Sequence, residues 1–287
     1  MKEHSQRFDP RQIMHGNDFE IFHYKEPRPD PVEVHHHDFY EVYFFLGGEV
    51  EYWVDGKTFH LEPGDLLLIN PMELHRPVVA FDSKTYERIV LWISKEYLES
   101  QSNEKIDLTR CFDTSLPTHT NLIHPKTVQR TAITNRLNEL VKESYSNDLG
   151  NELFARGLFL QFMVELNRMA LNPGKPRIVK EDSSPLVSQV LTYINEHFYE
   201  ELSLETIAKK FFVSKYYLSH AFSNEVGVSV YRYIILKRLT SACQMLSEGK
   251  SAKEVCVGCG FQDYTSFFRA FKSEYGLSPR DFVSGNN

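Results

Sequence analysis

The first third of the chain alternates hydrophobic and polar residues with the period of β-strands. Between residues 20 and 95, short runs rich in Tyr, Phe and Val are separated by glycine, proline and asparagine turns. Asp55-Gly56 lies between two such runs and suits a type I′ hairpin, because both central residues of that turn need a positive φ. Short, evenly spaced strands of this kind predict a small antiparallel barrel or sandwich.

The hydrophobic period changes to that of α-helices between residues 126 and 170. Two helices are predicted there, and the second is apolar most of the way round. We expect it to pack one face on its own barrel, while the other face either meets a partner subunit or is buried inside the same domain. Its apolar positions are Leu153, Gly157, Leu160 and Val164 on one side, and Phe154, Leu158, Phe162, Leu166 and Met169 on another.

From Ser184 onward the pattern predicts short helices. Ser184-Pro185 and Ser278-Pro279 each place a capping serine before a proline, and Ser251 with Glu254 forms a capping box. The polar stretch from Leu171 to Pro185 holds three prolines and a glycine, which is typical of a linker. The chain therefore divides into residues 1–170, a linker at 171–184 and a helical domain at 185–287.

The helical domain contains the same unit twice. A shift of 48 residues places Ser203 on Ser251, and a shift of 49 places Ser214 on Asp263. Each copy predicts a short helix, a tight turn and a second helix, which is a helix-turn-helix, and a long helix from Ser229 to about Leu246 joins the copies. The positions matched by the second shift also include Ala221 with Ala270, Phe222 with Phe271, Glu225 with Glu274, and Gly227 with Gly276.

The second helix of each copy has one apolar face and one face suited to DNA. Leu218 with Phe222, and Phe267 with Phe271, are i,i+4 pairs that can point into the core. Arg can bond guanine with two hydrogen bonds, and aromatic or threonine side chains can contact the methyl group of thymine. The residues expected on the opposite face are Lys215, Tyr216, Ser219 and His220 in the first copy, and Tyr264, Thr265, Phe268 and Arg269 in the second.

This doubled segment resembles the C-terminal signature of AraC-type (AraC/XylS) transcription regulators. The marks are Gly260-Phe261, Phe267, Phe268, Phe271, Lys272, Gly276 and Ser278-Pro279, with Leu218, Phe222, Gly227 and Arg238 in the first half. The resemblance spans about 100 residues and implies that the two second helices enter successive major grooves on one face of DNA, about 34 Å apart. It also implies double-stranded DNA and RNA polymerase as partners.

Several basic and sulfur-containing residues of this domain are open to more than one interpretation. Lys215, Lys272 and Arg280 are candidates for phosphate contact. Arg238, on the linking helix, can bind phosphate or pair with Glu or Asp inside the domain. Cys256 and Cys259 have metal-ligand spacing, but no second pair or nearby histidine completes a zinc site. They align with Ala208 and Phe211, so we expect them to be core residues.

The stretch "HHHDFYE" raises a separate question in the predicted barrel. AraC-type regulators often carry an N-terminal cupin barrel, and residues 20–95 resemble one. On a strand, residues of equal parity share a face, so His35, His37 and Glu41 can point inward while His36 points out. With His75 they form a possible iron, manganese or zinc set, although Glu73 stands where metal-binding cupins usually have glycine. The alternative is a pocket that binds an effector without metal.

Of these two alternatives, we expect a pocket that binds an effector and holds no cofactor. Aromatic rings beside histidines, Glu and Arg suit a sugar, because C–H groups pack on the rings and hydroxyls bond the polar groups. Tyr86, Arg88, Val90 and Trp92 share one face of a strand, but the sequence does not say whether it is the inner face. The expected effector-binding residues are His35, His37, Glu41, Tyr43, Tyr52, His75, Arg88 and Trp92.

The resulting functional prediction is a DNA-binding transcription regulator. It would be an activator, homodimeric, and responsive to a small effector such as a sugar. The fold class is α+β multidomain: a cupin-like β-barrel with a helical hairpin, then an all-α domain of two helix-turn-helix units joined by a long helix. Two alternatives have their own sequence features. A metal-dependent cupin enzyme would use His35, His37, Glu41 and His75, and an oxidation sensor would use Cys256 and Cys259.

Charge and composition agree with this prediction. From Thr206 to the end the chain has 11 Lys+Arg and 6 Asp+Glu, a balance of +5, whereas the remainder has 21 against 33, a balance of −12. A basic tail behind an acidic body favours contact with a polyanion. The segment "MKEHSQRFDP" lacks a signal-peptide core, and no apolar run approaches the roughly 18 residues of a membrane span. We expect a cytoplasmic protein whose four cysteines stay reduced.

Overall fold

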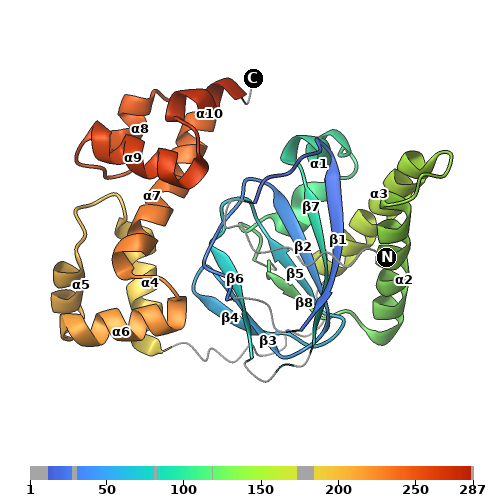
Figure 1. The fold of residues 1–287 in the computed structure, drawn as a ribbon, viewed down its shortest axis with the longest axis horizontal. Coiled ribbons are helices and arrows are strands. Elements are labelled where there is room, and N and C mark those ends of the chain that lie inside the picture. Colours follow the sequence, from blue (N-terminus) through green and yellow to red (C-terminus); the bar gives the residue numbers. More distant parts are fainter. Residues whose placement is uncertain are drawn as a thin grey trace. The chain divides into compact units, whose positions relative to one another are not determined.

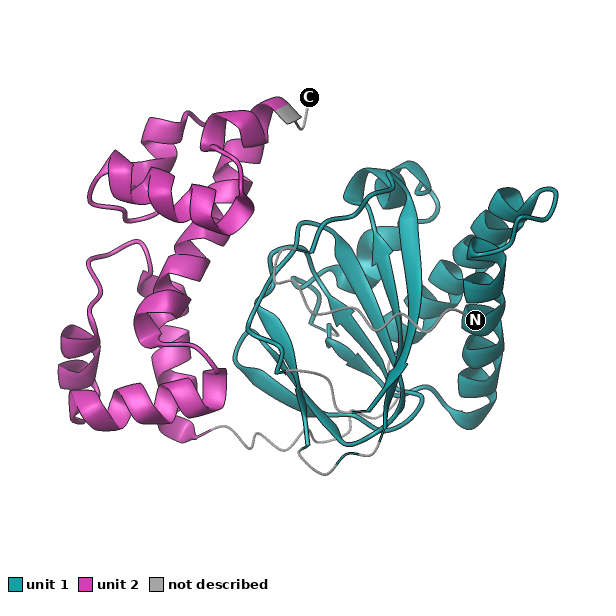
Figure 2. Cartoon of the chain, in the orientation of Figure 1, with its two compact units in different colours: residues 1–180 teal, residues 181–287 magenta. Residues whose placement is uncertain are grey.

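The chain forms two units in the computed structural model, which describes residues 12–27, 31–80, 83, 85–117, 119–172 and 184–285. Unit 1 comprises residues 1–180 and unit 2 residues 181–287 (Figure 2). Most of the predicted linker, from residue 173 to 183, and the segment "MKEHSQRFDP" lie outside the described residues.

Unit 1 is built on two antiparallel sheets. One has five strands in the order β1-β7-β2-β5-β8, and the other has three in the order β4-β3-β6 (Figure 1). Tyr43 and Leu67 on the first sheet share a buried core with Tyr52 and Phe59 on the second. The strands are β1 (Phe19–Glu26), β2 (Tyr40–Gly47), β3 (Val50–Val54), β4 (Lys57–His60), β5 (Leu66–Ile69), β6 (His75–Val79), β7 (Tyr86–Ile93) and β8 (Leu122–Ile123).

The cupin-like β-rich domain is confirmed, but its sheets do not close into a continuous barrel. The chain leaves the larger sheet at the end of β2, where Gly48 has a φ of +123°, and enters the smaller sheet at Val50. The predicted hairpin is present: Val54 pairs with Lys57, and Asp55 and Gly56 have φ values of 43° and 97°. Both values are positive, as a type I′ turn requires.

Helices cover the outer face of the five-stranded sheet. These are α1 (Lys95–Ser100), the short 3₁₀ helix η1 (Leu108–Phe112), α2 (Thr127–Ser144) and α3 (Asn151–Leu171) (Figure 1). Leu158, Phe159 and Phe162 of α3 are buried in one cluster with Ile89 and Leu91 of β7. The ring of Phe159 stacks on Phe19 of β1, with centroids 4.6 Å apart. The alternate residues of β7, Tyr86 and Val90, face the core between the sheets instead.

Asn167 of α3 links this helix to η1 by hydrogen bonds inside the core. Its side-chain oxygen accepts a hydrogen bond from the backbone N–H of Cys111 (3.0 Å), and its amide donates to the carbonyl of Leu108 (2.9 Å). The residue is only 6% exposed. Removing the side chain leaves these backbone groups buried without their partner, which typically costs about 1–3 kcal/mol.

We therefore expect Asn167→Ala to lower the free energy of unfolding of unit 1 by about 1–3 kcal/mol. Urea unfolding followed by tryptophan fluorescence measures this unit selectively, because both tryptophans of the chain, Trp53 and Trp92, lie in it. Asn172→Ala is the matched control: its amide lies at the exposed end of α3 and should change stability by less than about 0.5 kcal/mol. Equal losses in the two variants would contradict the assigned role of Asn167.

All regular secondary structure in the described part of unit 2 is helical. Ser203, Ser214, Ser229 and Ser251 cap helices, each accepting a hydrogen bond from a backbone N–H within the first turn, and the capping box predicted at Ser251 is among them. Ser184 precedes Pro185 as expected, but its side chain makes no capping hydrogen bond. The helices are α4 (Pro185–His197), α5 (Leu204–Lys210), α6 (Lys215–Val226), α7 (Val230–Ser247), α8 (Ala252–Gly258), α9 (Tyr264–Tyr275) and α10 (Pro279–Gly285).

Candidate nucleic-acid interface and histidine cluster

The repeated unit found in the sequence is present as two helix pairs, α5–α6 and α8–α9. The second helix of each pair begins at an equivalent cap: Ser214 accepts from the N–H of Tyr217, and Asp263 from the N–H of Ser266. Both second helices end at a glycine in the left-handed conformation, Gly227 and Gly276. The predicted core residues Leu218, Phe222, Phe267 and Phe271 are all fully buried.

The predicted DNA-facing residues lie on the opposite, solvent-facing side of α6 and α9. Tyr216 is 82% exposed and Tyr264 is 47% exposed. Ser219 and Phe268 are half-buried, whereas Lys215, His220, Thr265, Arg269 and Lys272 are exposed, as is Arg280 on α10. The surface that the sequence assigned to DNA is therefore accessible on both helices.

Two of these side chains on α6 already have local partners. The ammonium of Lys215 lies 3.4 Å from a carboxylate oxygen of Glu205 on α5. The side-chain amide of Asn224 lies 3.1 Å from Nδ1 of His220, and the rings of Tyr216 and His220 are nearly parallel. The Asn224 contact fixes the orientation of the imidazole and leaves its Nε2 edge for another partner.

Arg238 has a structural role, the second of the two interpretations that its position on α7 left open. Its Nε donates to the carbonyl of Phe198 and its Nη2 to the carbonyl of Glu200, both at 2.7 Å. These carbonyls lie just beyond the C-terminal end of α4, where a cation is favourably placed. The partners are backbone carbonyls rather than an acidic side chain, which a sequence pattern does not reveal.

The cysteines of the C-x-x-C segment are packed into the core of unit 2. Cys256 is 4% exposed and Cys259 fully buried, and the sulfur of Cys259 lies 3.5 Å from the sulfur of Met245. Burial raises the pKa of both thiols. A raised pKa reduces the thiolate fraction that oxidation and metal binding need.

In unit 1, four predicted residues converge in the interior, and we call His35, His37, Glu41 and His75 the histidine cluster. The potential ligand atoms of His37, Glu41 and His75 all lie within 4.8 Å of one another. His35 flanks them, with its ring 4.2 Å from that of His75, and pairs with His75 through two backbone hydrogen bonds. No side chain of the cluster is more than 4% exposed.

The backbone fixes the orientation of each imidazole. Nδ1 of His35, His37 and His75 lies 2.9, 2.9 and 2.8 Å from the carbonyl oxygen of Glu33, Phe39 and Glu73, respectively. A carbonyl only accepts hydrogen bonds, so each Nδ1 must carry the proton. When these rings are neutral, Nε2 is consequently an unprotonated acceptor.

Glu41 is the acidic member of the cluster. Trp92 donates its indole N–H to one carboxylate oxygen at 2.9 Å, and Nε2 of His37 lies 3.4 Å from the same oxygen. Burial alone would raise the pKa of Glu41, but the hydrogen bond and charge of His37, aided by His35 and Trp92, hold it below its usual range. Burial lowers the pKa of His35 to about 4 and that of His75 well below its usual value.

His36, which strand parity predicts to point outward, is buried as well. Its exposed fraction is 7%, and every residue from Val34 to His37 is buried. The segment precedes β2 and runs beside the start of β6, so it has no solvated face toward which alternate residues could turn. Alternation along this segment therefore leaves no residue exposed, because the three histidines are not part of a half-exposed strand.

The remaining predicted effector residues lie at the core between the two sheets. Trp92 and Arg88 are on the same side of β7 as Val90, which settles that this side faces the core between the sheets. Arg88 is held by Glu26 at 2.7 Å and lies over the ring of Tyr86, 4.0 Å from its centroid. Tyr43 and Tyr52 are buried and contact each other edge to face.

Sequence reasoning missed Phe39, which shapes the cluster. Its ring lies parallel to that of His37, with centroids 4.0 Å apart, and it also contacts Trp92. Its carbonyl is the group that orients His37. The equal parity of His37, Phe39 and Glu41 is the signal that could have identified it.

A sheet domain with an enclosed polar cluster, followed by two helix-turn-helix pairs, defines a ligand-responsive DNA-binding regulator. A model of the AraC-like ligand binding domain matches residues 18–163, and a helix-turn-helix domain model matches residues 207–284. The chain belongs to the AraC family of transcription regulators. No helix in the described part of the chain has the length and apolar character needed to cross a membrane.

Individual relatives cover most of the chain. The HTH-type transcriptional activator RhaS is 24% identical over 254 residues in Escherichia coli and 25% identical over 255 residues in Enterobacter sp., with 88% of each chain covered in both cases. The C-terminal domain of AraT from Geobacillus stearothermophilus is 29% identical over 36% of this chain and 88% of that chain, with a TM-score of 0.36. ToxT from Vibrio cholerae is 12% identical over 93% of this chain and 97% of that chain, with a TM-score of 0.39.

Proposed function

We propose that α6 and α9 read the DNA sequence and that the protein activates transcription in response to a small effector. The observation that carries the first part is the equivalence of the two helices, each with a buried face and a solvent-facing side of polar, basic and aromatic residues. Arg269 and His220 are the residues best suited to bond base edges. Lys215, Lys272 and Arg280 would contact phosphates and add affinity without sequence information.

We expect His220→Ala and Arg269→Ala each to weaken binding to the specific operator by about 1–3 kcal/mol and to relax its sequence preference. Electrophoretic shifts with the region upstream of its own gene measure the affinity, and competitor DNA measures the specificity. Lys253→Ala is the matched control, because it removes an exposed charge from α8, outside the proposed surface. Unchanged specific binding in both recognition variants would refute this assignment of α6 and α9.

The effector is proposed to be a small polar molecule such as a sugar. Trp92 and Arg88 are partly exposed, and Trp92 connects directly to Glu41 through its indole N–H. An effector that packs on Trp92 would therefore act on the buried cluster through one hydrogen bond. A thermal-shift screen of sugars tests this, because a ligand that binds only the folded state raises the melting temperature.

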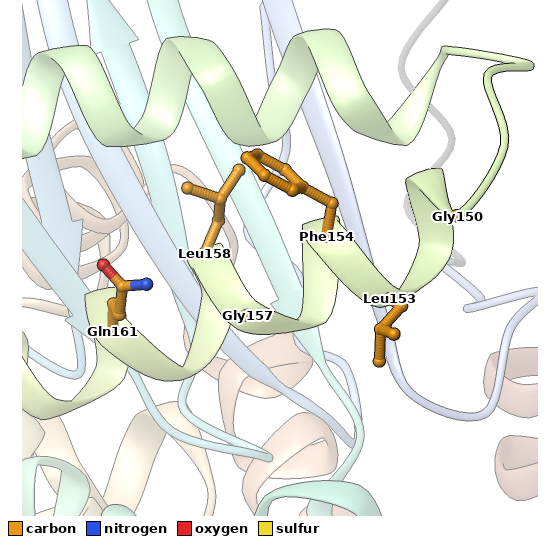
Figure 3. Close-up of a pocket in the computed structure, with 6 residues that line it drawn as sticks. All are labelled: Gly150, Leu153, Phe154, Gly157, Leu158 and Gln161. Carbon is orange, nitrogen blue, oxygen red and sulfur yellow. The ribbon is translucent and has the colours of Figure 1, made fainter.

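We also propose that α3 forms a homodimer interface. Leu153 is 76% and Phe154 53% exposed, and with Gly150, Gly157, Leu158 and Gln161 they line a shallow groove (Figure 3). Gly157 has open space around the position that a Cβ would occupy, so another helix can approach closely. The other residues of α3 from Phe159 to Met163 mostly pack inside unit 1, which leaves this end as the free apolar face.

The remaining parts of the proposal follow from the regulator role. As an activator the protein would contact RNA polymerase, and as a DNA-binding protein it would act in the cytoplasm. We propose no catalytic activity for it, since the family consists of transcription regulators.

A further inference from the structure

We propose that His37, Glu41 and His75 bind one divalent first-row transition-metal ion inside the sensing domain. Two imidazole nitrogens and one carboxylate oxygen suit Fe²⁺, Zn²⁺ or Mn²⁺. Two ligand atoms bonded to one ion at about 2.1 Å are at most about 4.2 Å apart. The three ligand atoms here lie within 4.8 Å of one another, so side-chain shifts of less than about 1 Å would bring them to bonding distance around one ion.

The hydrogen bonds around the cluster are those that metal ligands need. Nδ1 of His37 and of His75 donates to a backbone carbonyl, which fixes the ring and directs the Nε2 lone pair inward. Metal-bound histidines nearly always have such an outer partner. Glu41 is likewise held by the indole N–H of Trp92 on one oxygen, and the hydroxyl of Tyr52 lies 3.5 Å from the other.

Without a cation, this arrangement leaves polar atoms poorly matched. Nε2 of His75 is buried and has no hydrogen-bond partner, and the residue is fully enclosed. Nε2 of His37 lies 3.4 Å from a carboxylate oxygen of Glu41, a contact that is favourable only with a proton on Nε2 or a cation between the two atoms. An unsatisfied buried polar atom costs about 1–3 kcal/mol. One bound cation would satisfy all three groups at once.

Burial favours an ion over a larger occupant between these atoms. The side chains are at most 4% exposed, so a sugar could reach all three only if the two sheets separated. An ion needs only the space between the ligand atoms. Three protein ligands also leave a coordination position open, at which an oxygen of an effector could bind.

The experiment is a titration of the untagged, chelator-treated full-length protein with Co²⁺, followed by its visible absorption, and then displacement by Zn²⁺. We expect one ion per chain. His37→Gln and His75→Gln should each weaken binding by at least about 10–100-fold, the loss typical even for an outer partner of a ligand. His60→Gln is the matched control, since it removes an exposed histidine beside Glu51 and should leave the affinity unchanged.

A measurement on the unaltered protein guards against variants that fail to fold. In ¹⁵N NMR of the histidine side chains, Zn²⁺ should shift two Nε2 signals while their Nδ1 atoms stay protonated. Absence of binding, a doubly protonated His37 with no ion, or a response confined to other histidines would each overturn the proposal. The proposal is independent of DNA binding, because an electrophoretic shift with the metal-free protein tests that function separately.

Discussion

Gly260→Ala is expected to lower the free energy of unfolding of unit 2 by about 2–5 kcal/mol. Gly260 has a φ of +78°, which costs an L-residue about 1–2 kcal/mol. A Cβ there would also lie 2.6 Å from the carbonyl carbon of Tyr199 and 2.8 Å from its Cα. Backbone cannot move aside as a flexible side chain can, so overpacking adds about 1–3 kcal/mol. Hydrogen exchange of the amides in α8 and α9 measures the loss.

Gly249→Ala separates the cost of the positive φ from the cost of overpacking. Gly249 has nearly the same φ, +82°, but nothing lies within 4 Å of the position of an added Cβ. We expect this variant to lose only the conformational part, about 1–2 kcal/mol. If the two alanine variants lost equal amounts of stability, the close approach of Gly260 to Tyr199 would contribute nothing to the free energy of unfolding.

The second large effect concerns the proposed dimer. Changing Leu153 and Phe154 together to aspartate places two charges on the groove of α3, and burying them against another subunit would be strongly unfavourable. We expect a monomer in light scattering. Loss of the second linked DNA-binding domain should weaken binding to a two-site operator by about 10²–10⁴-fold.

Val128→Asp serves as the control for this prediction. Val128 is 83% exposed at the start of α2 and does not line the groove. The control variant should stay dimeric and bind DNA normally. A double variant that remains a dimer would show that the subunits meet elsewhere.

Local features of the fold could be predicted well from the sequence. The Asp55-Gly56 turn and the capping box of Ser251 and Glu254 depend on residues next to each other in the chain, and both are present. The repeated helix pair was recognisable because its core residues, such as Phe222 and Phe271, recur at a fixed shift. The turn and the capping box are thus determined by short-range geometry, and the helix pair by a pattern of core residues that each copy repeats.

Contacts between distant segments could be predicted only in part. His37, Glu41 and His75 were expected to meet, and they do, although the burial of His36 was not foreseen. The hydrogen bonds from Trp92 to Glu41 and from Arg238 to the carbonyl of Phe198 join residues far apart in the chain. Such partners depend on how the sheets and helices pack, which the periodicity of a single sequence does not specify.

The linking helix α7 has a consequence for how unit 2 unfolds. Its buried residues include Tyr233, Leu239 and Leu246. It packs against α6 of the first helix pair and against α8 and α9 of the second. Neither helix pair can melt without exposing part of this shared core to water. The two helices that we propose to read DNA should therefore be lost in one cooperative transition, with similar exchange rates for the slowest amides of α6 and α9.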